Sequence, residues 1–219
     1  MIRHHPEDEL IVDFATGALG EGPALVVATH AAMCGSCRAR VALVEAVGGL
    51  MLEDLEGEPV SAGLLDETLA MLDEGEDAAT VAAPVAATDD REQVPEPLLR
   101  YIGRGLSHLV WRRVPGFPAI EEARLPIAAG VKAVLMRLKS GAVVPEHSHR
   151  GNEYSVVLAG GFCDGATSYG RGDFLARDPS HTHRPAADND GDCLCLIVLD
   201  APLRLTGALG MIVNPFLRI

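Results

Sequence analysis

A stretch without hydrophobic periodicity, residues 75–96, divides the chain into two parts with different patterns. It is rich in alanine, proline and acidic residues, which is typical of a linker. Before it, apolar residues recur at helical spacing, and after it, short β-branched runs alternate with glycine and proline. The sequence therefore predicts an α + β protein with two domains, residues 1–74 and 97–219.

The N-terminal domain carries four segments with helical character. The first two have a proline near their expected start, where its missing N–H is not needed. The last has leucines at helical spacing after Ser61, a residue type that caps helices. The four segments are 6–19, 22–33, 34 to about 48–52, and 61–72. We predict a four-helix module.

The C-terminal domain has a shorter period. Runs such as 130–162 and 192–205 combine β-branched residues with regularly spaced glycine and proline. This pattern is typical of an all-β sandwich or barrel.

The net charge of −13 is unevenly distributed. Residues 1–74 have 14 acidic and 3 basic side chains, a net charge of −11, whereas residues 97–219 have a net charge of +3. An acidic domain repels the phosphate backbone, so direct nucleic-acid binding is not expected. A basic protein surface is a suitable partner, because complementary fields orient the two molecules as they meet.

Cysteine content and hydropathy indicate where the protein works. Five cysteines are an odd number, and two lie in a C-x2-C pair, which fits a reducing compartment better than a disulfide framework. We find neither an apolar run long enough to span a membrane nor the apolar segment of a signal peptide at the start. The sequence predicts a cytoplasmic protein without a membrane partner.

The segment "THAAMCGSCRAR", residues 29–40, has the spacing of metal ligands. His30 and Cys34 share one face of a helix, and the glycine after Cys34 can let Cys37 turn toward the same point. Thiolate and imidazole are good zinc ligands, and a structural zinc takes four. The fourth candidates in this domain are His4 and His5. Buried thiols without metal are the simpler alternative, and a thioredoxin-like redox pair would need alternating strands and helices.

A second group of candidate ligands lies in the C-terminal domain. His147 and His149 are two residues apart on a predicted strand, so both point to one side, and Glu153 follows a short turn that can return its carboxylate to them. The spacing G-x5-H-x-H-x3-E-x6-G, from Gly141 to Gly160, resembles the first motif of the cupin family. The resemblance implies a cupin β-sandwich or barrel with a bound metal.

The second cupin motif is matched less closely. Its usual Pro-x-Gly-x-x-His ending is absent here, and two histidines, His181 and His183, compete as the fourth ligand. We prefer His181 because of its distance from the Gly172–Asp173 pair. Three imidazoles and a carboxylate accept Zn, Fe, Mn, Ni or Cu, and we expect a second Zn²⁺ here.

Cys193 and Cys195 are alternate residues of a predicted strand, so both sulfurs face one side and the intervening leucine faces the other. If that side is the barrel interior, the thiols lie near the metal and form a candidate redox pair. The alternative is that they are small core residues.

An N-terminal histidine followed by H-x3-C-x2-C resembles the zinc-binding anti-sigma domain. This resemblance implies His5, His30, Cys34 and Cys37 as the zinc ligands and an extracytoplasmic-function sigma factor as the partner. The two motifs in this order resemble the ChrR family of anti-sigma factors along essentially the whole chain. The resemblance implies a transcriptional regulator, not an enzyme. Its N-terminal domain holds the sigma factor, and its cupin domain releases it in response to singlet oxygen or organic hydroperoxide.

Two alternatives differ from this interpretation. One is a metal-dependent cupin enzyme of the dioxygenase type, with the helical part as an appendage. The other is a zinc-dependent adaptor that binds a protein other than a sigma factor.

Overall fold

The computed structural model describes residues 1–74, 94–103, 105–127 and 130–206. Its helices are α1 (Asp8–Ala15), α2 (Glu21–Met33), α3 (Gly35–Glu53), α4 (Leu64–Glu74) and α5 (Glu96–Ile102), with a short 3-10 helix at Leu106–His108. Most of the predicted linker, residues 75–93, lies outside the described residues. Among the described residues, no helix is both long and apolar enough to cross a bilayer.

The strand region contains one large and two small antiparallel sheets. The large sheet has the order β1-β2-β3-β11-β5-β8, and the small ones are β10-β6-β7 and β12-β4-β9. The large sheet consists of β1 (Arg112–Val114), β2 (Phe117–Arg124), β3 (Lys132–Leu138), β5 (Glu153–Ala159), β8 (Phe174–Arg177) and β11 (Cys193–Leu199). The small sheets consist of β4 (His147–His149), β6 (Gly161–Asp164), β7 (Thr167–Gly170), β9 (Thr182–His183), β10 (Ala186–Ala187) and β12 (Leu203–Leu205). The predicted combination of helices followed by a cupin-like β domain is confirmed.

The central strand β11 is buried on both faces. Leu194, Leu196 and Val198 point to the side that α2 covers, whereas Cys193 and Cys195 point into the sandwich. The predicted alternation along this strand is therefore present, and both of its faces are apolar because each packs against another layer.

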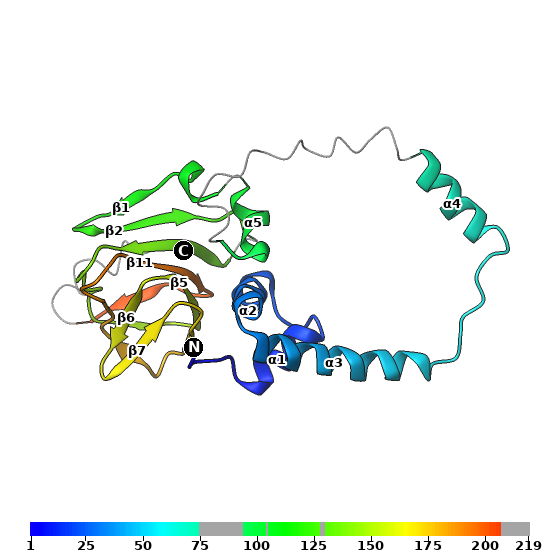
Figure 1. The fold of residues 1–219 in the computed structure, drawn as a ribbon, viewed down its shortest axis with the longest axis horizontal. Helices are drawn as coiled ribbons and strands as arrows, with labels where there is room; N and C mark the ends of the chain where they lie inside the picture. Colours follow the sequence, from blue (N-terminus) through cyan, green and yellow to red (C-terminus); the bar gives the residue numbers. More distant parts are fainter. Residues whose placement is uncertain (75–93, 104, 128–129, 207–219) are drawn as a thin grey trace.

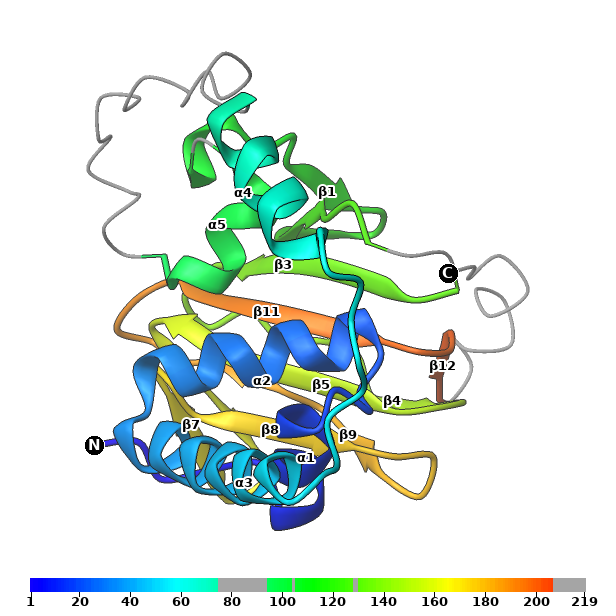
Figure 2. The same cartoon turned by 90° about the vertical axis from the view of Figure 1, so that its right-hand side faces the viewer.

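Helix α2 lies across the large sheet, over β11 and β5 (Figures 1 and 2). It is apolar all round because it packs against the sheet on one side and against α1, α3 and α5 on others. Gly22 allows the close approach, since a Cβ there would lie 2.7 Å from Val198 Cγ1 and 2.8 Å from Val131 Cγ1. As a result, the helical part and the strand part share one hydrophobic core.

The N-terminal part has four helices, as predicted, but only three of them pack together. Helix α1 contacts α3, and α2 contacts both, whereas α4 lies apart from the other elements (Figure 1). The expected apolar stripe of α4 is exposed, and so is the C-terminal half of α3. The exposed apolar side chains of these two helices are Leu43, Val47, Leu50, Met51, Leu52, Leu64, Leu65, Leu69, Met71 and Leu72.

Candidate metal centres

The first candidate centre brings together His5, His30, Cys34 and Cys37, whose ligand atoms all lie within 4.8 Å of one another. His30 is in the last turn of α2, and Cys37 is in the first turn of α3. The chain turns between the helices at Cys34, which has an extended backbone, and not at the glycine after it as expected.

The distances within this cluster match a tetrahedral zinc site. His5 Nδ1 lies 3.4 Å from the Sγ atoms of both Cys34 and Cys37, and His30 Nε2 lies 3.3 Å from Cys37 Sγ. Zinc bonds of 2.0–2.3 Å in a tetrahedron place ligand atoms roughly 3.3–3.8 Å apart. The four residues therefore fit the ion that the sequence predicts.

Burial keeps Cys37 and His30 neutral when no metal is bound. Burial raises the pKa of Cys37 to about 11, so without a metal its thiol stays protonated. Burial also lowers the pKa of His30, which keeps the imidazole neutral and able to coordinate. His30 Nδ1 donates to the Gly172 carbonyl at 2.7 Å, which leaves Nε2 for the cluster.

His4 lies outside this centre. Its Nε2 is 3.3 Å from the Ser168 carbonyl, and its ring packs on Tyr169 with 4.5 Å between the centroids. Of the two histidines that spacing alone left open, His5 lies in the cluster and His4 does not. His5 is the exposed member of the cluster.

The second candidate centre contains His147, His149, Glu153 and His183, all buried, with ligand atoms within 4.8 Å of one another. His183 Nε2 lies 2.9 Å from His147 Nε2 and 3.1 Å from His149 Nε2. Glu153 Oε2 lies 3.6 Å from His149 Nδ1, a buried nitrogen that has no hydrogen-bond partner among the described residues.

The structure brings His183, and not the preferred His181, into this cluster. Strand β9 pairs with β4 so that His183 lies directly opposite His147, which places its ring in the cluster. His181 lies before the strand, its side chain is 47% exposed, and its Nδ1 bonds to the Asp178 carboxylate at 2.8 Å. Strand register, which the motif spacing does not contain, decides between the two histidines.

The imidazoles of this centre are arranged so that they could hold a cation between them. His147 Nδ1 donates to the Pro145 carbonyl at 2.7 Å, and His183 Nδ1 donates to Asp164 Oδ2 at 3.0 Å. Burial lowers the pKa of His147 to about 4 and also lowers that of His183, so both rings are neutral at neutral pH. Their Nε2 lone pairs then face each other at 2.9 Å, an arrangement that a shared metal ion stabilises.

Glu153 supplies the negative charge of the centre. Burial raises the pKa of this carboxyl to about 7. A bound divalent cation would favour the carboxylate and displace the proton.

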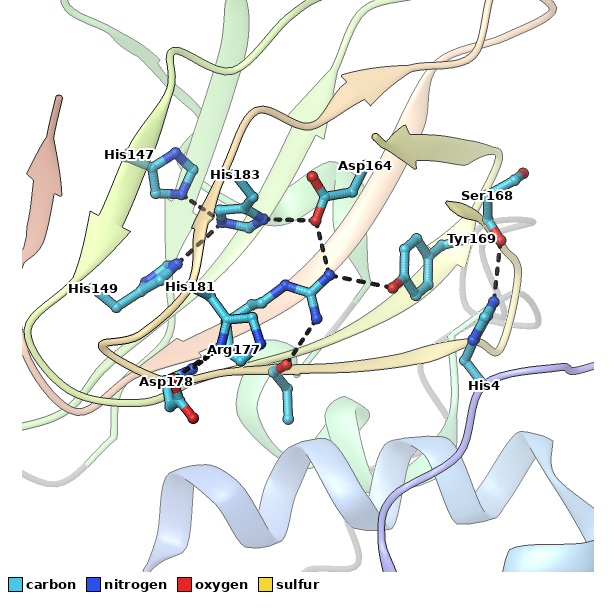
Figure 3. A network of polar contacts seen from close by, with 11 residues as sticks. His4, His147, His149, Asp164, Ser168, Tyr169, Arg177, Asp178, His181 and His183 are labelled. Atoms are coloured by element: carbon cyan, nitrogen blue, oxygen red, sulfur yellow. Dashed lines mark hydrogen bonds and ion pairs between the residues drawn. The ribbon is translucent and has the colours of Figure 1, made fainter. Parts of the chain in front are cut away.

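Sequence reasoning missed the residues that support this centre. Asp164 holds His183, and Arg177 Nη2 donates to Asp164 Oδ2 at 2.8 Å and to the Tyr169 hydroxyl at 3.3 Å (Figure 3). Burial acts to raise the pKa of Asp164, but its bonds to Arg177 and His183 outweigh this, and the pKa is lowered. No local spacing pattern marks either residue, because they meet His183 only through strand pairing.

The cysteine pair of β11 lies beneath this centre. The Sγ atoms of Cys193 and Cys195 are 3.6 Å apart, and Cys195 lines a small cavity with His147, Glu153 and His183. The bond to Cys193 and burial both raise the pKa of Cys195. This favours the thiol over the reactive thiolate.

Two cavities differ in their relation to the second centre. The one beside it has a volume of about 70 Å³ and a largely apolar lining, far below the 300–1,000 Å³ of typical ligand pockets. A cleft of about 700 Å³ lies between the helical part and the cupin part, and His5 and Arg177 are among its lining residues. None of the four residues of the second centre lines that cleft.

These features define a cupin protein with an N-terminal helical module and a histidine–cysteine cluster. Residues 106–201 match the family described as ChrR Cupin-like domain. The chain is 38% identical over 218 residues to anti-sigma-E factor ChrR of Cereibacter sphaeroides, covering 100% of this chain and 99% of that protein. It therefore belongs to the ChrR family.

One solved structure gives the same result. The crystal structure of Rhodobacter sphaeroides SigE in complex with the anti-sigma ChrR matches at a TM-score of 0.78 and 37% identity, covering 91% of this chain and 100% of that one. An acetylacetone dioxygenase from Acinetobacter johnsonii matches at a TM-score of 0.41 and 13% identity, over 46% of this chain and 74% of that one.

Proposed function

We propose that this chain is an anti-sigma factor that binds an extracytoplasmic-function sigma factor through its helical part and releases it on an oxidative signal. The full-length match to anti-sigma-E factor ChrR carries this proposal. A relative of this family has been crystallised with SigE, which makes a sigma factor the partner to test first.

The exposed surface of α3 and α4 supports a protein partner. Ten large apolar side chains of these two helices are exposed, five on each, and exposed apolar surface that the rest of the chain does not cover marks interaction sites. The same part of the chain is strongly acidic, so a partner with basic and apolar faces complements it, whereas nucleic acid does not.

We assign Zn²⁺ to the cluster of His5, His30, Cys34 and Cys37. Its two sulfur and two nitrogen ligands form a closed structural set. Zinc there would hold the N-terminal segment, α2 and α3 in one arrangement, and so keep the partner surface of α3 in place.

We assign a second divalent ion, also Zn²⁺, to His147, His149, Glu153 and His183. In the proposed mechanism an oxidant, singlet oxygen or an organic hydroperoxide, acts on this centre or on the thiols of Cys193 and Cys195. The bond to Cys193 and burial keep Cys195 protonated, which disfavours its reaction with an oxidant. Replacing both cysteines with serine tests whether the thiols take part in releasing the sigma factor. Unchanged release by hydroperoxide would remove the thiols from the mechanism.

A metal-dependent cupin enzyme has less support. Four protein ligands leave little open coordination, and the adjacent cavity of about 70 Å³ has no room for a substrate of ordinary size. Turnover of a small molecule by the metal-loaded chain would favour this alternative. We place the regulator in the cytoplasm, where sigma factors bind RNA polymerase.

The decisive experiment is co-expression of the full chain with each extracytoplasmic-function sigma factor of its own genome, followed by size-exclusion chromatography and zinc analysis. We expect one sigma factor to elute with the wild-type chain and to be lost with the Cys34→Ser, Cys37→Ser variant. Cys163→Ser is the matched control, because that thiol is exposed and outside both clusters. A folded, zinc-loaded chain that retains no sigma factor would contradict the proposal and leave the adaptor interpretation.

A further inference from the structure

Strand β8 and the two residues before it lie between the candidate centres. At one end the Gly172 carbonyl accepts the Nδ1–H of His30. At the other end Arg177 bonds to Asp164, which in turn holds His183. The four residues of β8 span roughly 13 Å in an extended conformation. This short segment therefore contacts His30 of the first cluster directly and His183 of the second through Asp164.

The first end of β8 also positions His5. Asp173 Oδ1 accepts the backbone N–H groups of Arg3 at 2.6 Å and His4 at 3.0 Å, and Phe174 N–H donates to the His4 carbonyl at 3.0 Å. Because β8 is the edge strand of the large sheet, the N-terminal segment occupies an otherwise unpaired edge. Two ligands of the first cluster, His5 and His30, are thus held by this edge.

The second end is built around Arg177. It lies opposite Glu153 in the pairing of β8 with β5, so it sits beside a residue of the second cluster. Its guanidinium bonds to Asp164 and to the hydroxyl of Tyr169, whose ring packs on His4 (Figure 3). A second route therefore runs from His183 through Asp164, Arg177 and Tyr169 to the residue next to His5.

We infer that β8 couples the two centres, so that filling the cupin cluster changes the zinc affinity of the cluster of His5, His30, Cys34 and Cys37. A cation on His183 polarises the ring and strengthens its bond to Asp164, which is shared with Arg177. The coupling involves two states of the chain. In one the N-terminal segment is docked on β8, and in the other it is released from β8. The inference rests on the proposed function, which assigns metals to both clusters.

This route makes residues 75–93 unnecessary for signalling between the two parts. The signal passes directly across the interface, through hydrogen bonds that join the helical part to β8. Coupling between two binding sites is reciprocal, so loading the first cluster must change the metal affinity of the second by the same factor.

The test measures metal affinity at the first cluster in the full-length chain. Cobalt(II) held by thiolates has a charge-transfer absorption that imidazole and carboxylate ligands do not give, so it reports this cluster alone. The zinc affinity of this cluster is obtained from a competition titration in which zinc displaces the cobalt. It is measured twice, in the wild-type chain with its cupin cluster loaded and in the His147→Ala, His149→Ala variant, whose cupin cluster cannot be loaded. We expect the two affinities to differ about fivefold or more.

Two further variants test the route. Asp173→Asn removes the charged acceptor of the N-terminal segment, and Arg177→Gln removes the bonds to Asp164 and Tyr169. When either substitution is present, the zinc affinities of the first cluster with the cupin cluster loaded and with it removed should be equal, so their ratio should fall to about one. Asp190→Asn and Arg113→Gln, exposed residues outside the network, are the matched controls and should keep the wild-type ratio. If Asp173→Asn does not fold, Arg177→Gln alone tests the route.

The outcomes separate this inference from the proposed function. If the wild-type chain gives no thiolate absorption with cobalt, the metal assignment fails and the inference fails with it. If the absorption is present but the ratio is about one, the metal assignment stands and the coupling is overturned. A ratio that both Asp173→Asn and Arg177→Gln leave unchanged overturns the route through β8.

Discussion

Single residues decide how the two clusters are made. His183 belongs to the second centre because strand pairing sets it opposite His147, whereas His181, two residues earlier, points to solvent. Asp164 fixes the ring of His183, and Gly172 fixes that of His30. Both of these orienting residues lie far in the sequence from the histidine they hold, whereas His147 is oriented by the nearby Pro145 carbonyl.

Replacing His183 with alanine should remove the cupin metal. It takes away one of four ligands and leaves Asp164 without its imidazole partner. Metal analysis of the purified chain should find two ions per wild-type molecule and one per variant. His181→Ala is the matched control and should retain both ions. Loss of the cupin metal from that control instead would restore the prediction made from motif spacing.

Asp173 should contribute to stability in a pH-dependent way. Burial acts to raise its pKa, but the N–H groups of Gly170, Arg3 and His4 outweigh this, and the pKa is lowered from 3.8. A carboxyl whose pKa is lowered by folding stabilises the protein above its unfolded pKa, and this contribution is lost as the pH falls through the folded value.

We therefore expect Asp173→Asn to lower the free energy of unfolding by about 1–3 kcal/mol at pH 7, the usual cost of losing hydrogen bonds to a charged group. The difference from wild type should shrink as the pH falls below 3.8 toward the folded pKa. Urea unfolding at a series of pH values measures it, with Asp190→Asn as the control. A difference that stays constant with pH would show that the charge of Asp173 is unimportant.

Much of the first centre could be predicted because its signal is local. His30, Cys34 and Cys37 lie within eight residues, and helical geometry brings them together. The cupin ligands on β4 and β5 follow from strand alternation in the same way. The sequence offered both His181 and His183, and it could not show which of them joins the cluster, nor that Arg177 and Asp164 support it, since these residues meet only through pairing between strands. The packing of α2 on the sheet could not be predicted either, because the sequence of an apolar helix does not show which element it packs against.

At the scale of elements, helices α3 and α4 have a different role from α1 and α2. The buried residues of α3 are Cys37 and Val41, near its start, and its remaining apolar side chains are largely exposed. Burying such a surface requires a partner, and the charge of this part favours a basic one.

Polar substitutions on this surface should weaken sigma-factor binding without destabilising the free chain. Leu50→Ser on α3 and Leu69→Ser on α4 replace side chains that are 64% and 50% exposed. Substitutions at such sites usually change stability by about 0.5 kcal/mol or less. Calorimetric titration against the partner should show an affinity loss of about tenfold, as for the anchors of an interface. Thr68→Ser on α4, an exposed and uncharged position, is the control, and equal losses in all three would indicate a non-specific effect.

At the scale of the whole molecule, the helical part and the cupin part are one cooperative unit. Their apolar residues form a single cluster in which Val26 and Val27 of α2 lie with Leu196 and Val198 of β11. The hydrogen bonds of Asp173 and Gly172 cross the same boundary.

Thermal unfolding should therefore be a single transition. Circular dichroism at a helix wavelength and at a strand wavelength should give the same midpoint, and the cobalt–thiolate absorption should disappear with them. Removing the metal with a chelator should lower the helix and strand midpoints together, because zinc stabilises the folded state by mass action. Two separate transitions, with the helical one lower, would show that the shared core is too weak to join the parts.

The contacts across this boundary also set an order of events in synthesis. Arg3 and His4 meet Asp173 over separations of 170 and 169 residues, and His30 meets Gly172 over 142. At roughly 5–20 residues per second, the helices leave the ribosome about ten seconds before their support in β8 is made. A newly made chain thus exposes its helices before the strand that supports them exists, so the first cluster can reach its supported form only after the cupin part is made.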